Sequence, residues 1–177
     1  MRSTVYLALL GVILLTLALV VRSGMLASHH PEEPMSAAMR AVMAETAPQF
    51  SSADAAIIRR DFPTAYTTKS GLMYVNLGPG TGDAMPRAGA VVTLEFTARL
   101  LDGTPVGSSK TAGGPSTVRI GVGDTTRGLD EALMSMRKGA RRMLIIPYWL
   151  AYGDAGKPPI IPPRATLVLD VRLLGFR

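Results

Sequence analysis

Histidine and cysteine, which often supply nucleophiles, general bases and metal ligands, are scarce in this chain. It has no cysteine and two histidines, the adjacent pair His29 and His30. Because no further ligands lie nearby in the sequence, this pair is better read as part of a solvated linker than as a metal site. The sequence also shows no Ser-His-Asp set and no phosphate-binding glycine loop. We therefore expect neither a metal nor a cofactor.

Positive charge is concentrated in the C-terminal two thirds of the chain. The net charge is +6; residues 1–68 contain five Arg against five acidic residues, and residues 69–177 contain 14 Lys and Arg against eight. Such a surface favours acidic partners or anionic lipid headgroups, or serves only solubility. The basic residues are not interleaved with aromatic ones along one element, so nucleic acid is not an expected partner.

The hydrophobic pattern after Thr67 predicts several strands. Apolar and polar residues alternate with period 2 through residues 92–100 and 167–173, as expected for strands with one buried face. The expected strands are residues 72–77, 92–100, 117–120, 141–146 and 167–173.

One amphipathic helix is expected between these strands, over Leu129–Lys138. It has an apolar stripe at helical spacing, acidic residues in its first turn, Arg137 and Lys138 in its last turn, and Gly139 directly after. The combined pattern predicts an α+β half-barrel of antiparallel strands wrapped on one short helix.

Five short motifs within this predicted fold resemble those of the FKBP family, the macrolide-binding peptidyl-prolyl isomerases. They are DGT followed by SS (102–109), RGLDEAL (127–133), AYG (151–153), IIPP (160–163) and ATLVLDV (165–171). The resemblance covers about residues 70–176, and motifs in this order are specific. It implies a curved sheet packed across one helix, and isomerisation of X-Pro bonds in proteins.

That reaction fits a sequence in which no Ser-His-Asp set and no cluster of metal ligands is visible. The rotational barrier of roughly 18–20 kcal/mol arises from amide resonance, so no bond has to be made or broken. A dry, apolar site that binds the twisted amide better than the planar one lowers this barrier.

The resemblance also implies which residues form the site. Tyr152 matches a tyrosine whose hydroxyl group hydrogen-bonds a bound carbonyl, and Ile160 with Ile161 matches a loop that closes over the proline. The residues implied for catalysis are Phe96, Val106, Leu129, Tyr152, Ile160 and Ile161. Those implied for substrate binding are Asp124, Thr125, Thr126 and Leu169.

Several large rings of the family pocket are missing here. Val106 and Gly107 stand where the family has Phe and Asp, and Ser116 and Leu169 replace two further aromatic residues. Each buried aromatic side chain covers roughly 150–250 Å². The thinned pocket therefore predicts weak isomerase activity and weak macrolide binding.

The N-terminus contains a long apolar run, Val5–Val21, flanked by Arg2 and Arg22. A helix of this length spans roughly 27 Å, close to the thickness of the hydrocarbon layer. A cleaved signal peptide and an uncleaved anchor are both compatible; the length of the run favours an anchor that holds residues 4–21 in the membrane. Charge at the two ends favours a domain on the periplasmic or extracytoplasmic side.

We therefore predict an anchor or uncleaved signal at residues 1–22, a linker with two short helices at 23–66, and an FKBP-type domain at 67–177. The two helices are expected at 36–45 and 51–62, the second with Ser52 as its N-cap.

The leading hypothesis is a membrane-tethered isomerase that acts on proline-containing polypeptides outside the cytoplasm. The rival is a non-catalytic, FKBP-like subunit of a membrane protein complex. A third possibility is a chaperone that uses an exposed apolar cleft without isomerisation.

Overall fold

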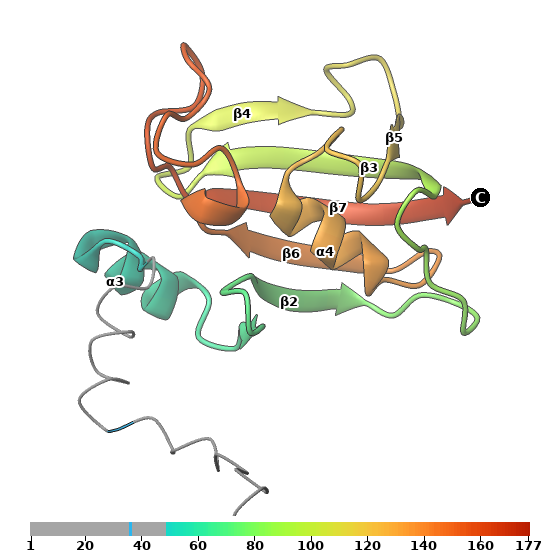
Figure 1. The fold of residues 1–177 in the computed structure, drawn as a ribbon, viewed down its shortest axis with the longest axis horizontal. Coiled ribbons are helices and arrows are strands. Elements are labelled where there is room, and N and C mark those ends of the chain that lie inside the picture. The colour runs from blue at the N-terminus through green and yellow to red at the C-terminus, as the bar shows by residue number, and fades with distance from the viewer. Residues whose placement is uncertain (1–35, 37–48) are drawn as a thin grey trace, which may run out of the picture. The chain divides into compact units, whose positions relative to one another are not determined.

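The computed structural model describes Ser36 and residues 49–177 (Figure 1). The predicted membrane segment and the predicted helix at 36–45 thus lie outside the described residues, Ser36 excepted. Within the described part, no helix is both long and apolar enough to cross a membrane.

An antiparallel sheet of seven strands forms the centre of the domain (Figure 1). The strand order is β1-β2-β6-β7-β3-β4, and β5 also pairs with β3. The strands are β1 (Tyr66–Thr67), β2 (Met73–Gly78), β3 (Val91–Leu100), β4 (Pro105–Ser108), β5 (Ser116–Arg119), β6 (Arg141–Ile146) and β7 (Leu167–Phe176). All five strands expected from the sequence are present, and the predicted antiparallel α+β architecture is confirmed.

Helix α4 (Arg127–Met134) crosses one face of the sheet (Figure 1). The Oγ1 atom of Thr126 accepts a hydrogen bond from the backbone N–H of Leu129 and caps its start. The helix begins earlier and ends earlier than predicted, so the prediction that Arg137 and Lys138 occupy its last turn is wrong. Ser135 is the C-cap residue, and its hydroxyl group donates to the carbonyl oxygen of Ala132 at 2.8 Å.

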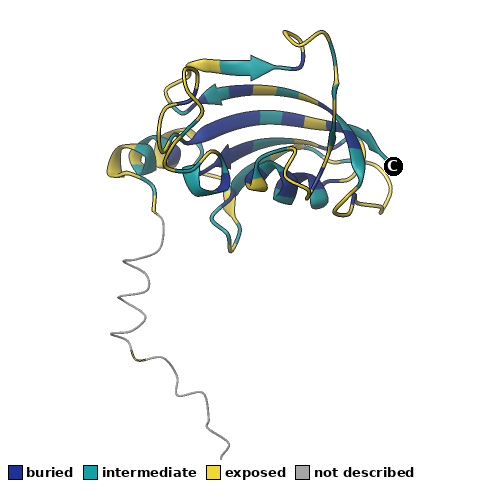
Figure 2. Ribbon diagram, turned by 45° about the horizontal axis from the view of Figure 1, so that its top comes forward, coloured by how far each residue is buried: buried dark blue, intermediate teal, exposed yellow. Residues whose placement is uncertain are grey.

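The main core lies between α4 and the sheet (Figure 2). Val92 and Leu94 of β3 point into it and are at most 1% exposed, as the period-2 pattern predicts. Leu133 of α4 and Met136 just after it are fully buried against them. This packing fixes α4 on the sheet and with it the loop that precedes the helix.

Helix α3 (Ser52–Asp61) belongs to the same compact unit, which runs from Pro48 to Arg177. Its N-cap is Ser51, one residue before the predicted cap. The Thr166 hydroxyl donates to the Asp54 carboxylate at 2.7 Å, and the rings of Phe50 and Trp149 are 5.2 Å apart. The segment that the sequence placed in a linker therefore packs against the domain.

A second, small apolar contact accompanies α3. Ile145 and Val168 are register partners on the sheet face opposite α4, yet they are 0% and 1% exposed. Ile58 of α3 is 4% exposed, and all three residues stand outside the main core cluster. We conclude that α3 covers this end of the outer sheet face.

Candidate active site

Eight of the ten predicted site residues line one cavity of about 370 Å³ between α4, the sheet and the β5–α4 loop. They are Phe96, Val106, Asp124, Thr125, Thr126, Leu129, Tyr152 and Leu169. The structure thus brings six separate segments together around one cavity. The first and last of these residues, Phe96 and Leu169, are more than 70 positions apart in the sequence.

Alternation along β3 supplies the central wall of this cavity. Leu94, Phe96 and Ala98 all point toward α4, and Leu169 of β7 is the register partner of Ala98. Leu94, Ala98 and Val118 were not among the predicted site residues. The period-2 pattern that places Phe96 inward would also have found the first two.

The segment that leads into α4 supplies the polar part of the wall. Thr125 donates its hydroxyl hydrogen to the Asp130 carboxylate, and Asp130 is only 7% exposed. The sequence indicated Asp130 only as an acidic residue of a first helical turn. Asp130 also has a positioning role, because its hydrogen bond with Thr125 holds that residue and the adjacent backbone in place beside the cavity.

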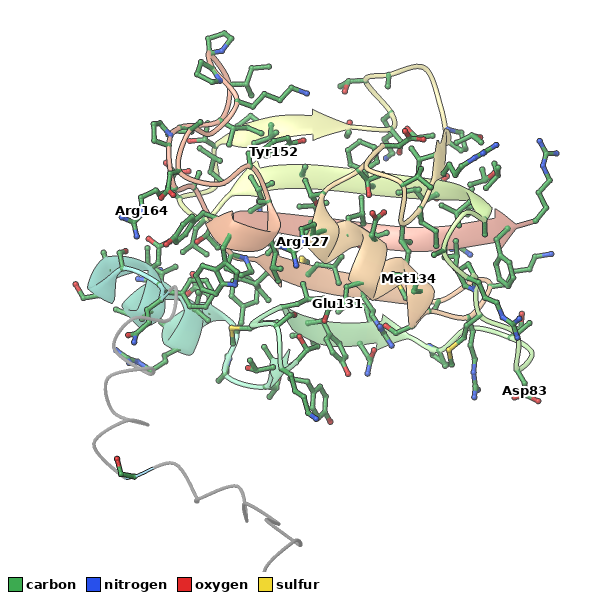
Figure 3. All side chains as sticks on the ribbon, in the orientation of Figure 1. Asp83, Arg127, Glu131, Met134, Tyr152 and Arg164 are labelled. Atoms are coloured by element: carbon green, nitrogen blue, oxygen red, sulfur yellow. The ribbon has the colours of Figure 1, made fainter. Side chains whose placement is uncertain are left out.

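Tyr152 stands at the mouth of the cavity, 37% exposed (Figure 3). Its hydroxyl group has no hydrogen-bond partner within the described residues, and the Lys157 ammonium lies 5.5 Å from its ring centroid. Arg164 braces the same loop: its guanidinium donates to the Tyr148 hydroxyl at 2.8 Å, and its N–H donates to the carbonyl of Gly153 at 3.2 Å. A free hydroxyl on a braced loop is suited to bind a substrate carbonyl.

Ile160 and Ile161 do not line the cavity. Ile161 is 3% exposed and belongs to the main core, whereas Ile160 is 56% exposed. Both lie in the loop between Lys157 and Ile161, which form an isolated bridge. That this pair closes over a bound proline stays a prediction.

The lining allows binding but little acid–base chemistry. Asp124 is its only ionisable carboxyl group, and the residue is exposed to solvent. Gly107 and Ser116, where the resemblance implies larger groups, line the wall formed by β4 and β5. Such a site can hold a compact apolar ring and offer it a hydroxyl group and backbone groups.

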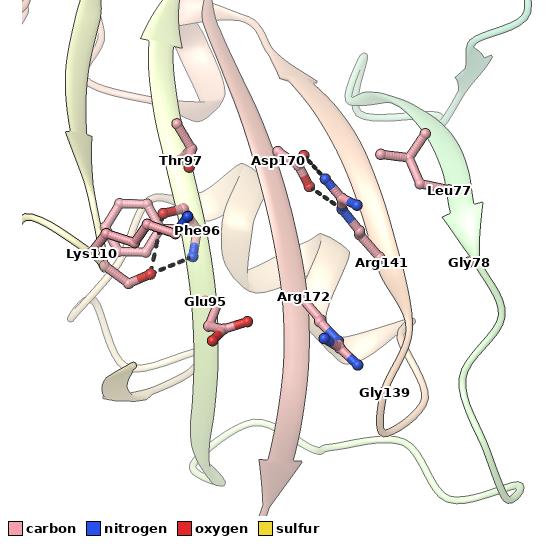
Figure 4. Close-up of a pocket in the computed structure, with 11 residues that line it drawn as sticks. Leu77, Gly78, Glu95, Phe96, Thr97, Lys110, Gly139, Arg141, Asp170 and Arg172 are labelled. Carbon is pink, nitrogen blue, oxygen red and sulfur yellow. Dashed lines mark hydrogen bonds and ion pairs between the residues drawn. The ribbon is translucent and has the colours of Figure 1, made fainter. Parts of the chain in front are cut away.

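A second hollow of about 440 Å³ lies on the sheet face opposite α4 (Figure 4). Its walls carry charge: Arg141 binds Asp170 through two nitrogens, with Nε 2.8 Å from Oδ1, and Glu95 and Arg172 lie beside this pair. The hydrogen bonds to Asp170 raise the pKa of Arg141 above its ordinary value. A hollow with these walls does not suit a pyrrolidine ring.

A curved antiparallel sheet packed on one helix, with an apolar cavity between them, defines a small α+β ligand-binding domain. The sequence pattern of the family described as "FKBP-type peptidyl-prolyl cis-trans isomerase" matches residues 82–174. The chain belongs to this family.

Two relatives and one solved structure show the extent of the similarity. "FK506-binding protein 1" of Yarrowia lipolytica is 42% identical over 106 residues, 60% of this chain and 98% of that protein. "FK506-binding protein 4" of Dictyostelium discoideum is 41% identical over 124 residues, 69% of this chain but only 33% of that protein. The crystal structure of FkpA from Escherichia coli matches with a TM-score of 0.65 and 32% identity, over 78% of this chain and 64% of that one.

Proposed function

We propose that this chain is a peptidyl-prolyl cis-trans isomerase that acts on proline-containing polypeptides. The observation that carries the proposal is the cavity that eight predicted residues line, with the free Tyr152 hydroxyl group at its mouth. A proline ring in this cavity would be shielded from water, and Tyr152 would bind a neighbouring carbonyl. The missing rings at Val106, Ser116 and Leu169 make the activity weak and macrolide affinity low.

The test mixes residues 49–177 with a peptide that has one X-Pro bond. NMR exchange spectroscopy then measures the rate of cis-trans exchange of that bond. This assay needs no protease and therefore detects low activity. Exchange faster than in buffer, with saturation as the peptide concentration rises, supports the proposal. An exchange rate equal to that in buffer at high protein concentration rejects catalysis.

We further propose that residues 4–21 tether the domain to a membrane and hold it outside the cytoplasm. The support is the sequence alone: a largely apolar run of 17 residues between Arg2 and Arg22, followed by Glu32 and Glu33. In that position the isomerase would meet polypeptides that fold after translocation.

A second candidate function is supported by two small residues in the cavity wall. Gly107 and Ser116 preserve the fold but remove the walls that would grip a proline, as in a non-catalytic subunit of a membrane complex. Extraction in a mild detergent followed by size analysis distinguishes the two. A fixed set of partners favours the subunit, and a free monomer favours the enzyme.

A further inference from the structure

Positive charge gathers at one end of the sheet, where β3 and β6 begin and β7 finishes. Val91 and Arg177 exchange backbone hydrogen bonds of 2.9 and 3.0 Å there, and Val91 is the register partner of Arg119. We call this region the basic end. Its basic residues are Arg87, Arg119, Arg137, Lys138, Arg141, Arg142, Arg172 and Arg177, and its acidic residues are Asp83, Glu95 and Asp170.

The basic end therefore holds five of the six excess positive charges in residues 49–177, because the remainder has eight basic and seven acidic residues. It is also remote from the mouth of the cavity. Asp83 marks the basic end in Figure 3, and Tyr152 lies toward the opposite end of the sheet. Charge of this kind is not required by the isomerase site.

Few of these cations are neutralised within the protein. Asp170 binds Arg141, and Asp83, whose side chain is fully exposed, lies 3.6 Å from Arg137. Within the described residues, no ion pair joins a carboxylate to the remaining members, Arg87, Arg119, Lys138, Arg142, Arg172 and Arg177. Arg142 is the most constrained, since it bonds Asn76 and Ser135.

Two arginines even oppose each other directly in the sheet. Arg141 and Arg172 are register partners on β6 and β7, and their side chains point to the same exposed face (Figure 4). Like charges directly opposite each other in an antiparallel pair destabilise the sheet. A carboxylate accompanies each arginine, since Asp170 bonds Arg141 and Glu95 is the register partner of Arg172 on β3. An anionic partner would offset the net positive charge that the other cations of the basic end add.

Exposed aliphatic side chains accompany the charge. Six large hydrophobic residues are exposed in the described part of the chain, and Leu77, Met85 and Val122 lie at the basic end, at 46%, 44% and 53%. Leu77, Met85 and Arg137 line one shared hollow of about 480 Å³. Val122 follows Gly121, whose position abuts Ala88 of the neighbouring loop.

We propose that the basic end docks on the surface of a bilayer that contains anionic lipids. The cations would contact headgroup phosphates, while Leu77, Met85 and Val122 enter the interfacial layer. A nucleic acid or an acidic peptide would account for the cations alone; the aliphatic side chains beside them favour a lipid interface. Since Tyr152 follows the far end of β6, the cavity would stay open to polypeptides in water.

The proposal is tested on residues 49–177, which lack the N-terminal apolar run. These residues contain the whole described core, and the Yarrowia lipolytica relative shows that about 106 residues of this kind make up nearly a complete protein. The fraction of protein that sediments with phosphatidylcholine vesicles is compared with the fraction that sediments with vesicles containing about one third phosphatidylglycerol. We expect binding only to the anionic vesicles, and less of it as salt rises.

Three double variants and one single variant separate the effect of charge from that of insertion. Arg137→Glu with Lys138→Glu should lower the partition coefficient at least about tenfold, since each basic residue near the surface contributes appreciably. Arg59→Glu with Lys69→Glu changes the net charge by the same amount at the opposite end of the domain. This control should lower the partition coefficient much less. Leu77→Ser with Met85→Ser should weaken binding to vesicles but not to heparin, and Tyr66→Ser should change neither.

Three results would overturn the proposal: no binding to anionic vesicles at low salt, an equal loss from the two charge-reversal variants, or an unchanged affinity in the aliphatic double variant. If the aliphatic double variant kept its affinity for both vesicles and heparin, the basic end would be a simple polyanion-binding site. Thermal unfolding of each variant shows that the fold is kept. None of these outcomes depends on isomerase activity.

Discussion

At the scale of single residues, Tyr152 is the side chain on which the proposed activity depends most. Its hydroxyl group is unbonded within the described residues, while its loop is held by Arg164 through Tyr148 and Gly153. A hydroxyl held ready in this way costs little further ordering when it binds a substrate carbonyl. The nearby Lys157 ammonium lies over the ring, 5.5 Å from its centroid.

Removal of this hydroxyl group should therefore lower activity without unfolding the protein. For Tyr152→Phe we expect a loss of about three- to tenfold in kcat/KM, the equivalent of one hydrogen bond of about 0.5–1.5 kcal/mol. Exchange spectroscopy on an X-Pro peptide measures it. Tyr66→Phe is the matched control, since Tyr66 is 63% exposed on β1 and does not line the cavity. Equal activities of the two variants would exclude Tyr152 from the mechanism.

Val106 offers the reverse test, a gain of function. It lies on β4 along one side of the cavity, is only partly buried, and stands where the family has a phenylalanine. In Val106→Phe the added ring covers part of that side, and we expect kcat/KM to rise about threefold or more, mainly through a lower KM. A titration of peptide affinity with the same variant checks this. An unchanged KM would show that the missing ring does not limit binding.

At the scale of elements, the contact between α4 and β6 depends on a residue without a side chain. A Cβ atom at Gly128 would lie 2.5 Å from Cγ2 of Ile146, which is fully buried. Gly128→Ala should therefore destabilise the domain: overpacking costs about 1–3 kcal/mol, more than the up to about 1 kcal/mol that Ala gains over Gly in a helix. Urea unfolding measures the change.

Gly107→Ala is the control for this substitution, because nothing lies within 4 Å of a Cβ atom at that position. We expect it to alter the free energy of unfolding by no more than about 0.5 kcal/mol. If both variants unfolded at the same urea concentration, close approach of α4 to β6 would not be what requires glycine at position 128.

Helix α3 gives a second prediction at this scale. A chain that begins at residue 66 loses Ile58, and with it the cover over Ile145 and Val168, and loses the bond between Asp54 and Thr166. Relative to residues 49–177, we expect a melting temperature about 5–10 °C lower, since burial of one large aliphatic side chain contributes about 1.5–3 kcal/mol. Ile58→Ala alone should produce a smaller fall in the same direction. Equal melting temperatures would mean that α3 is not part of the stable domain.

The two central strands β3 and β7 could be predicted from the sequence because every second residue over 92–100 and 167–173 is apolar. Val92–Leu100 and Leu167–Phe176 lie at the centre of the sheet with only one face in the main core. The limits of α4 could not be predicted, since Arg137, Lys138 and Gly139 resemble the end of a helix. The Ser135 hydroxyl group bonds the carbonyl oxygen of Ala132 where the helix ends, and this bond depends on local geometry.

The site could be predicted to the same extent and for a related reason. Residues fixed by a strand or by the start of α4, such as Phe96 and Leu129, line the cavity as expected. Ile160 and Ile161 lie in a loop, where no hydrophobic period predicts which side chains point inward. Neither residue lines the cavity. The burial of Asp130 and the packing of α3 depend on contacts between distant segments, with Thr166 lying 112 positions after Asp54.

At the scale of the whole molecule, the apolar run and the basic end favour the same surroundings by different physical means. The largely apolar run of 17 residues would act through transfer into hydrocarbon, which salt does not reverse. The excess of five charges would act through attraction to anionic headgroups, which salt screens over about 10 Å at 0.1 M. Two such contacts on one chain reinforce each other through their effective concentration.

This difference allows the tether to be tested in cells that produce the full chain. We expect the full chain to remain in the membrane fraction after washing with 1 M NaCl and with alkaline carbonate, because a spanning segment is removed by neither. Residues 49–177 should leave the membrane in the salt wash. If the predicted orientation holds, protease added outside the sealed inner membrane should degrade the domain while a cytoplasmic marker stays intact. Release of the full chain by carbonate would contradict the anchor, and protection from the protease would place the domain on the cytoplasmic side.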